Sequence, residues 1–145
     1  MNILIITGIF PPDIGGPATY VPLIAQALVE RGHQVRVVTL SDVAPAGDSA
    51  CSFPLLRIPR GQWYPLRWLR TAGAIIRHGR SADVLFVNGL ALEAVAANLF
   101  LRKPLVQKIV GDLAWERTRT AGIATDTLEV FQRKKYSLRV ELLKK

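Results

Sequence analysis

The sequence predicts an α/β protein built on a Rossmann-like, doubly wound parallel sheet. Short apolar segments rich in β-branched residues alternate with longer segments in which apolar residues recur every three or four positions. The first strand–helix–strand unit is complete within about forty residues, a length that suits a parallel crossover unit. The alternation continues after it, which favours one parallel sheet with helices on both faces. The first strand is expected at the centre of that sheet.

The first predicted unit covers residues 2–40. The segment "NILIIT" (Asn2–Thr7) is continuously apolar, as is typical of a strand that is covered on both faces. The helix after it is predicted to begin near Pro17, because the N–H group that proline lacks has no hydrogen-bond partner in a first helical turn. It ends before Gly32, since glycine favours the left-handed conformation that follows many helices. The segment "HQVRVVTL" (His33–Leu40) is the second predicted strand.

The remaining elements give weaker signals. Further strands are predicted at residues 53–58, 82–87 and 104–110, and further helices at residues 66–77, 91–101 and 126–145. The residues expected to form the buried stripe of the 66–77 helix are Leu66, Leu69, Gly73 and Ile76. The sequence contains no repeat and no interdomain linker, so it predicts a single domain.

Composition narrows the class of protein. The chain has 145 residues, of which 50% are hydrophobic, enough to bury a core. A single cysteine, Cys51, excludes an intrachain disulfide, and no metal site is expected. The longest nearly apolar stretch, 89–101, contains Glu93 and is too short to span a bilayer. The N-terminus lacks the basic region of a signal peptide. We therefore expect a cytoplasmic protein.

The positive charge is concentrated in one interval. The net charge is +8, and no acid occurs between Asp48 and Asp83. That interval contains Arg57, Arg60, Arg67, Arg70, Arg77 and Arg80. Such an interval attracts phosphates or an anionic membrane, although a solvated helix face has the same composition.

The segment "RGQWYPLRWLR" (60–70) adds aromatic residues to these arginines. Aromatic and cationic side chains together suit a membrane interface or a stacked nucleic-acid base. The interpretation favoured here is an amphipathic helix whose tryptophans, Trp63 and Trp68, pack inward, because their spacing also fits core burial. A membrane surface ranks second, and no nucleic-acid partner is expected.

The segment "FPPDIGGPATY" (Phe10–Tyr20) joins the first strand to the first helix. Ligands of doubly wound sheets bind beyond the carboxyl ends of the strands, and the helix after this loop directs its N–H groups toward that edge. Gly15 and Gly16 permit close approach of the backbone, so we expect them to contact a phosphate. The alternative is a turn needed only for geometry. Asp13 belongs to the same loop and is expected at the same edge of the sheet. The dinucleotide fingerprint G-x-G-x-x-G and the P-loop pattern are both missing.

Residues that follow two later strands are expected at the same edge. Asn88 and Gly89 follow the 82–87 strand, and Gly111 and Asp112 follow the next one. Asp112 is the candidate catalytic residue, because a carboxylate there could orient a hydroxyl group of a bound molecule or take its proton. It could equally cap a helix. No paired carboxylates, Ser-His-Asp arrangement or metal-ligand spacing accompany it.

The opening "MNILIITGIFPPDIGGPATYVPLIAQALVERGHQVRVVT" (1–39) resembles that of a family 4 glycosyltransferase. The similarity lies in a strand, a loop with "PP…GG" and a helix ending in "ERGHxVxVVT", and it continues through "DVLFVNGL" and "PLVQKIVGDLAWE". The resemblance implies the N-terminal half of a GT-B arrangement, in which two Rossmann-like domains face each other across a cleft. It also implies that Gly15 and Gly16 lie against the donor diphosphate or the transferred sugar, and that Asp13 lines the cleft.

The function implied by the resemblance is a retaining transfer of a hexose from a nucleoside-diphosphate sugar to a hydroxyl of a glycan or lipid-linked acceptor, without a cofactor. Residues 1–145 would be the acceptor-side domain, truncated before the donor domain and inactive alone. The resemblance is also compatible with peripheral contact of this domain with the inner face of an anionic membrane. Many family members carry a histidine near the position of Asp112, and this chain has none there. Two alternatives remain open: a fragment of a nucleotide-dependent oxidoreductase, and a non-catalytic Rossmann-like binding module.

Overall fold

The computed structural model of the chain describes residues 1–42, 51–108, 115, 118–119, 122 and 127–134. The chain forms two compact units, 1–108 and 109–145. The elements of the larger unit are β1 (Asn2–Thr7), α1 (Gly16–Glu30), β2 (Gln34–Leu40), β3 (Leu55–Ile58), α2 (Tyr64–Gly79), β4 (Val84–Asn88), α3 (Ala91–Leu101) and β5 (Leu105–Gln107). The smaller unit contains α5 (Leu128–Arg133).

The five strands form one parallel sheet in the order β3-β2-β1-β4-β5. Ile5 of the central strand β1 is paired with Val37 of β2 and with Phe86 of β4. The predicted fold class and the central position of the first strand are therefore confirmed. The chain progresses from β1 to β3 in one direction and then returns to β4 on the other side of β1. The switch point, where ligands bind in doubly wound sheets, accordingly lies between β1 and β4.

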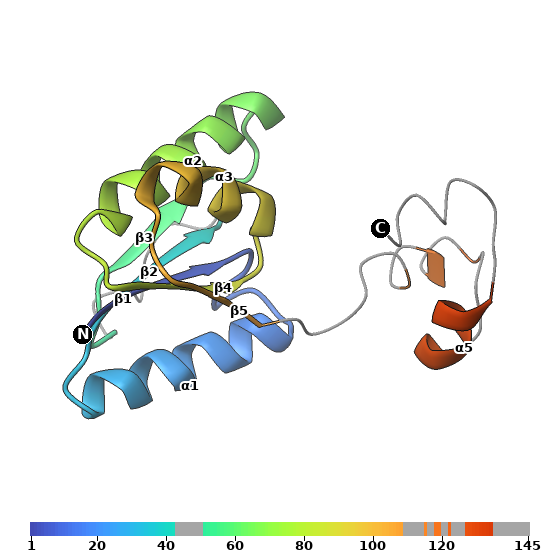
Figure 1. Ribbon diagram of the computed structural model, residues 1–145, viewed down its shortest axis with the longest axis horizontal. Coiled ribbons are helices and arrows are strands. Elements are labelled where there is room, and N and C mark those ends of the chain that lie inside the picture. The colour runs from blue at the N-terminus through green and yellow to red at the C-terminus, as the bar shows by residue number, and fades with distance from the viewer. Residues whose placement is uncertain (43–50, 109–114, 116–117, 120–121, 123–126, 135–145) are drawn as a thin grey trace. The chain divides into compact units, whose positions relative to one another are not determined.

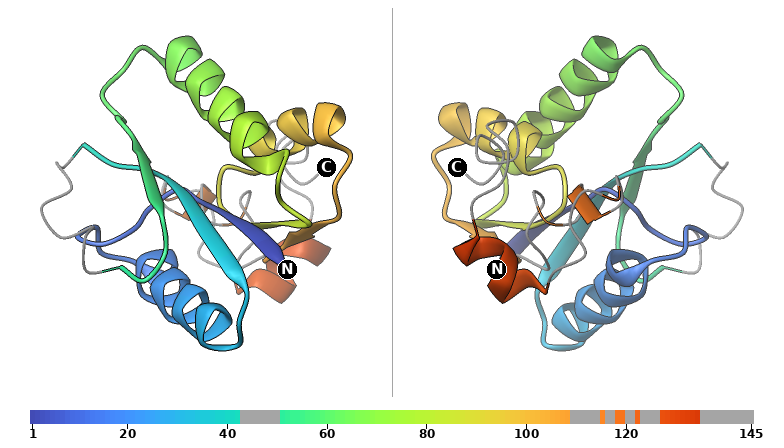
Figure 2. Two further views of the ribbon diagram at one scale, coloured as in Figure 1. Left: turned by 90° about the vertical axis from the view of Figure 1, so that its left-hand side faces the viewer. Right: turned by 90° about the vertical axis from the view of Figure 1, so that its right-hand side faces the viewer.

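Helices cover both faces of the sheet, with α1 on one face and α2 and α3 on the other (Figure 1; Figure 2). The core on the α1 face includes Ile3, Ile5, Val21, Ala25 and Val37. The core on the α2 and α3 face includes Leu4, Ile6, Ile75, Leu85 and Ala94. Successive side chains of β1 enter opposite cores, which explains why this strand is apolar at every position from Ile3 to Ile6.

Helix α2 differs from its predicted form. Its buried residues are Thr71, Ala72, Ile75 and Gly79. The predicted stripe was wrong for Leu66, Leu69 and Gly73, which are exposed, whereas Ile76 packs against the core. Small residues face inward because α2 packs closely on α3: a Cβ at Gly79 would lie 2.5 Å from Leu101 Cδ1. The inward packing expected for the tryptophans was also wrong for Trp63, whose side chain is 77% exposed.

Other boundaries agree more closely with the predictions. Gly32 has a φ of +81° and follows the C-cap of α1, as predicted. Strand β5 is shorter than predicted, and residues 109 and 110 lie outside the described part of the chain. Of the helix predicted for 126–145, the structure describes α5, which ends at Arg133, and the next residue, Lys134, has extended backbone angles. Residues 126 and 135–145 of that prediction lie outside the described part of the chain. No described helix has the length and apolar character needed to cross a membrane.

Candidate functional site

The loop after β1 contains two glycines in different environments. Gly15 is the N-cap of α1 and has a φ of +154° and a ψ of +167°, a conformation that is open essentially to glycine alone. Gly16 begins the helix, and a Cβ placed there would meet no atom within 4 Å. No side chain caps this end of α1. The turn therefore needs glycine at position 15. Position 16 adjoins open space, where an anion could accept hydrogen bonds from N–H groups in the first turn of α1.

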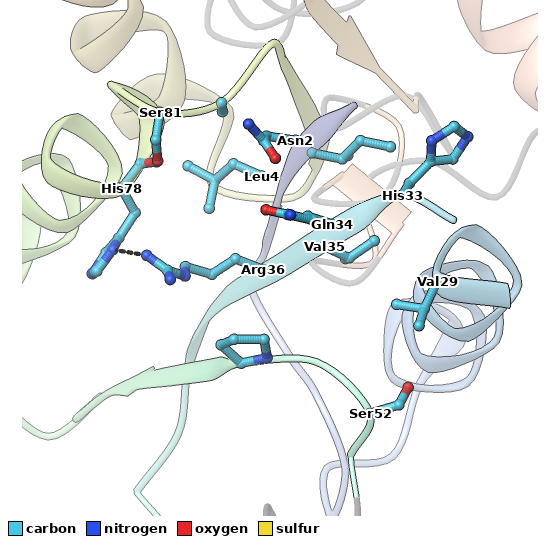
Figure 3. Close-up of a pocket in the computed structure, with 13 residues that line it drawn as sticks. Asn2, Leu4, Val29, His33, Gln34, Val35, Arg36, Ser52, His78 and Ser81 are labelled. Carbon is cyan, nitrogen blue, oxygen red and sulfur yellow. Dashed lines mark hydrogen bonds between the residues drawn. The ribbon is translucent and has the colours of Figure 1, made fainter. Parts of the chain in front are cut away.

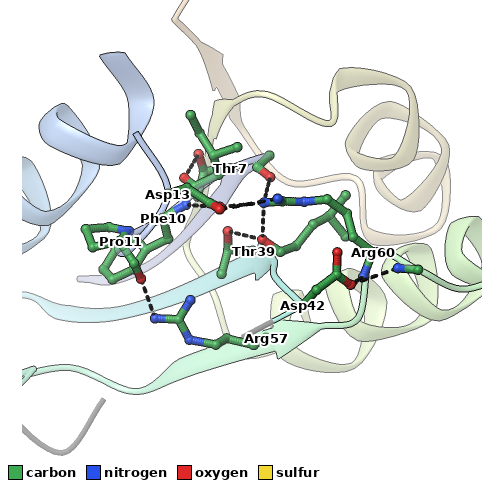
Figure 4. A network of polar contacts seen from close by, with 12 residues as sticks. Thr7, Phe10, Pro11, Asp13, Thr39, Asp42, Arg57 and Arg60 are labelled. Carbon is green, nitrogen blue, oxygen red and sulfur yellow. Dashed lines mark hydrogen bonds and ion pairs between the residues drawn. The ribbon is translucent and has the colours of Figure 1, made fainter. Parts of the chain in front are cut away.

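Arg60, which follows β3, holds this loop in place (Figure 4). Its guanidinium forms an ion pair with the carboxylate of Asp13, and Nη2 also donates to Leu40 O at 2.8 Å and to Gly8 O at 3.4 Å. The hydrogen bond from Arg60 lowers the pKa of the Asp13 carboxyl, and the same contact raises the pKa of Arg60. Asp13 is thus a fixed carboxylate that orients the glycine loop.

Two further contacts complete this polar network. Asp42, which follows β2, accepts hydrogen bonds from the backbone N–H groups of Arg60 at 2.6 Å and Gly61 at 2.8 Å. Arg57 Nη2 donates to Pro11 O at 2.7 Å, and its guanidinium lies 5.5 Å from the centre of the Phe10 ring. The loop after β1 is therefore tied to the segment around the end of β3 by two arginines.

The loops after β1 and β4 touch at the switch point. Thr7 Oγ1 donates to Ile9 O at 3.0 Å and lies 3.3 Å from Asn88 O. Gly89 has a φ of +127°, and a Cβ there would lie 2.8 Å from Gly8 N. Asn88 is buried, and its Nδ2 has no hydrogen-bond partner among the described residues. A buried amide donor of this kind is a group that a bound molecule or water would satisfy.

Five of the seven predicted site residues share the carboxyl edge of the sheet. Asp13, Gly15 and Gly16 follow β1, whereas Asn88 ends β4 and Gly89 follows it. The two remaining residues, Gly111 and Asp112, lie outside the described part of the chain. Contacts of all seven residues with a ligand stay predictions, as does the catalytic role of Asp112. The described residues contain no group of three or more His, Cys, Asp or Glu side chains that could hold a metal.

Sequence reasoning missed three cations at this edge. Arg57 and Arg60 were treated only as members of a basic interval, although their position at the end of the third predicted strand was a signal. Lys108 directly follows β5, and its Nζ lies 3.0 Å from the centre of the Tyr20 ring of α1. Three cations therefore lie against this loop and the start of α1, and Asp13 is the described carboxylate that forms an ion pair with one of them, Arg60.

A five-stranded parallel sheet with a glycine turn at its switch point places the chain among the doubly wound, Rossmann-like α/β domains. The sequence profile of the glycosyl transferase 4-like domain matches residues 15–137. The chain belongs to this family. No curated protein sequence matches the chain significantly.

Solved structures share the fold at low sequence identity. Alr3699/HepE from Anabaena, solved in complex with UDP and glucose, is 20% identical with a TM-score of 0.60, over 83% of this chain and 34% of that one. MurG from Acinetobacter baumannii is 16% identical with a TM-score of 0.56, over 86% of this chain and 40% of that one. The C-terminal domain of PF1911 hydrogenase from Pyrococcus furiosus is 15% identical with a TM-score of 0.56, over 74% of this chain and 91% of that one. The chain thus spans about a third of the length of the HepE structure.

Proposed function

We propose that this chain is the acceptor-side domain of a retaining glycosyltransferase that moves a hexose from a nucleoside-diphosphate sugar to a hydroxyl. The observation that carries the proposal is the Gly15–Gly16 turn at the switch point of a glycosyl transferase 4-like domain. Two similar folds support the donor class. HepE was solved with UDP and glucose, and a further similar structure, at a TM-score of 0.53, is the lipopolysaccharide outer core galactosyltransferase WaaB.

The glycine turn is the proposed contact for the donor diphosphate or the transferred sugar. The first-turn N–H groups of α1 and its positive dipole end favour negative charge, and the open space at Gly16 leaves room for it. Arg60 contributes indirectly, because its guanidinium is already paired with Asp13 and fixes the loop. Asn88 Nδ2 is a further proposed donor to the ligand at the β1–β4 crevice.

Transfer needs parts that the described residues do not supply. We assign most contacts with the nucleotide-sugar donor to a second domain, which would face this one across the cleft. Residues 1–145 alone should therefore not catalyse sugar transfer. Asp112 remains the proposed group that orients the acceptor hydroxyl or takes its proton. The reaction is proposed to need no metal and no other cofactor.

The acceptor is proposed to be a glycan or a lipid-linked molecule reached at an anionic membrane. Helices α2 and α3 lie side by side on one face of the sheet (Figure 1). Their exposed large apolar residues are Tyr64, Leu66, Leu69, Leu92, Val95, Leu99 and Phe100, together with Trp63 just before α2. Arg70 and Arg77 are exposed on α2. Apolar and cationic side chains together suit the surface of an anionic bilayer.

Two rival functions make different predictions. The likeness to a hydrogenase domain gives the fold alone, and the missing G-x-G-x-x-G pattern argues against a nucleotide-dependent oxidoreductase. A non-catalytic binding module would bind a nucleotide sugar without transferring it. Transfer assays with nucleoside-diphosphate hexoses distinguish both rivals from the proposed enzyme.

The experiment compares Gly16→Val with Gly73→Val in the longest polypeptide encoded by the reading frame that contains this chain. Both glycines have open space at the Cβ position, but Gly73 lies on α2, away from the glycine turn. Gly16→Val should keep the thermal unfolding midpoint and lower kcat/KM tenfold to a hundredfold, which corresponds to about 1.5–3 kcal/mol for one charge-assisted hydrogen bond. Gly73→Val should transfer normally to a water-soluble glycan acceptor, because that reaction does not require the proposed membrane contact of α2.

The outcomes separate the parts of the proposal. Normal folding and parental transfer by Gly16→Val would show that the glycine turn does not contact the donor. Failure of the parent to use any nucleoside-diphosphate hexose, in the presence of lipid-linked and glycan acceptors, would contradict the enzymatic function itself. A product with inverted anomeric configuration would contradict retention alone.

A further inference from the structure

A cavity of about 400 Å³ lies at the opposite edge of the sheet, where the strands begin (Figure 3). Its wall is formed by the starts of β1 and β2, the segment before β3 and the end of α2, with Asn2, Arg36, Pro54 and His78 among its lining residues. Small-molecule sites in proteins commonly have volumes of about 300–1,000 Å³. The cavity is therefore large enough for a small organic ligand, and it lies away from the glycine turn.

The cavity exists because β3 is shorter than β2. The paired register of these two strands begins at Val37 and Leu55, so residues 34–36 of β2 extend past the start of β3. Val37 N–H donates to Pro54 O at 2.9 Å. Because N–H groups alternate along a strand, the Val35 N–H faces the same side, where β3 has not yet begun. That side of β2 consequently offers backbone as well as side chains to the cavity.

A cation and its imidazole partner point into this space. Arg36 Nη1 lies 2.5 Å from His78 Nδ1 (Figure 3). Burial, together with the charges of Arg36 and Arg77, lowers the pKa of His78 and so favours the neutral imidazole. Because a guanidinium can only donate, Nδ1 is the acceptor in this contact. The remaining ring proton is then on Nε2. A neutral imidazole orients Arg36 without cancelling its charge.

Among the residues that the structure describes, the cavity lining supplies no acid to neutralise the charge of Arg36. None of the 13 residues around the cavity is Asp or Glu. Asp83 directly follows the lining residue Ala82 but does not itself line the cavity. Its Oδ2 accepts a hydrogen bond from the backbone N–H of Asn2 at 2.7 Å. A half-buried guanidinium in an acid-free cavity favours a ligand that brings its own negative charge.

The rest of the lining is mainly apolar, and polar side chains occur beside Arg36. The apolar residues are Ile3, Leu4, Val29, Val35, Pro54 and Ala82. We propose that the cavity binds an organic anion, whose phosphate or carboxylate group pairs with Arg36 and whose apolar body lies against these side chains. Asn2 and Gln34 also line the cavity and supply further hydrogen-bonding groups. The ligand is distinct from the proposed transfer substrates, because the two sites lie at opposite edges of the sheet.

The test titrates the isotopically labelled 145-residue chain with four probes and follows the backbone amide resonances. Phenyl phosphate and benzoate carry both an anionic group and an apolar body, inorganic phosphate lacks the body, and benzyl alcohol lacks the charge. Phenyl phosphate or benzoate should shift the resonances of residues 33–36 and 78–82 at lower concentration than either incomplete probe. Binding by only one of the two complete probes would identify the anionic group as phosphate or carboxylate.

Matched variants distinguish the cavity from general attraction to a basic protein. Arg36→Gln should weaken phenyl phosphate binding at least about tenfold, as expected for loss of a charge-assisted contact. Arg70→Gln removes the same charge from the exposed first half of α2 and should change the affinity less than twofold. If Arg36→Gln fails to fold, Gln34→Glu provides the second test. Gln34 is an exposed lining residue, so this substitution places a carboxylate at the cavity and should weaken phenyl phosphate binding by repulsion.

Three results would overturn the proposal. The first is equal loss of affinity in Arg36→Gln and Arg70→Gln, and the second is unchanged affinity in Gln34→Glu. The third is a set of shifts confined to residues 7–16, which would assign the probe to the glycine turn. Because the readout is binding to this domain, it is independent of glycosyl transfer.

Discussion

Arg60 reaches across β2 to pair with Asp13, so that one guanidinium joins the carboxyl ends of three neighbouring strands. Its Nη2 contacts Asp13 of the loop after β1 and donates at 2.8 Å to Leu40 O at the end of β2, while Arg60 itself follows β3. The two side chains are 32% and 19% exposed. The pair is therefore partly shielded from water, and its main effect is to fix the glycine loop on the sheet.

The first prediction concerns this pair. Arg60→Gln should lower the free energy of unfolding by about 1–2 kcal/mol, because partly buried acceptors on Asp13 and Leu40 lose their donor. Arg31→Gln is the matched control: Arg31 is exposed and makes one side-chain contact, to Ala27 O at 3.4 Å. Urea denaturation measures both changes. Equal losses in the two variants would show that the Arg60 network does not stabilise the fold.

The second prediction concerns acid. The hydrogen bond from Arg60 lowers the pKa of Asp13 in the folded chain, so the unfolded chain binds more protons at this position. The contribution of the pair is complete above the unfolded pKa of about 3.9, and it is lost as the pH falls through the lower folded value. Asp13→Asn should therefore flatten the decline of stability below that pH. An unchanged acid profile, measured by urea denaturation, would argue against the ion pair.

The third prediction concerns the contact between the loops after β1 and β4. Gly89→Ala should lower stability by about 1–3 kcal/mol, because the residue has a positive φ. A Cβ there would also lie 2.8 Å from the backbone nitrogen of Gly8. Gly8→Ala is the control, since a Cβ at Gly8 meets nothing within 4 Å. Comparable thermal unfolding midpoints for the two variants would contradict the close approach of these loops.

The fourth prediction concerns the membrane. The chain should sediment with anionic lipid vesicles at low salt and dissociate as salt is added, because screening shortens the reach of exposed charges. Arg70→Glu on α2 should weaken sedimentation more than Arg31→Glu at the end of α1, although both reverse one exposed charge. Salt-independent sedimentation with neutral vesicles would contradict an electrostatic contact. Equal effects of the two reversals would contradict a specific role for α2.

The parallel sheet was predictable because its strands are apolar without interruption and its helices have a different period. An apolar run such as Ile3 to Ile6 is typical of a strand covered on both faces. The predicted helix and second strand that follow it in the sequence support that assignment. The buried face of α2 was not predictable from period alone. Apolar residues occur around more than one side of this helix, and close packing on α3 selects the small residues Ala72 and Gly79.

Site residues that directly follow a strand in the sequence were predicted. Contacts that depend on the order of the strands within the sheet were missed. Gly15 and Asn88 follow recognisable strands, so their edge of the sheet could be deduced. The pairing of Arg60 with Asp13 requires β3 and β1 to flank β2, which the sequence does not state. The distinction between Gly15 and Gly16 likewise depends on backbone angles. The cavity beside Arg36 arises from the length of β3, and strand ends are poorly defined in sequence.

The central position of β1 has a consequence for synthesis on the ribosome. This strand emerges before both of its neighbours in the sheet: β2 begins at Gln34, whereas β4 begins only at Val84. Until then, one edge of an apolar strand has open hydrogen-bonding groups, a state that promotes pairing with other chains. A nascent chain halted before Val84 should therefore be bound by chaperones, and release should follow once β4 has left the exit tunnel.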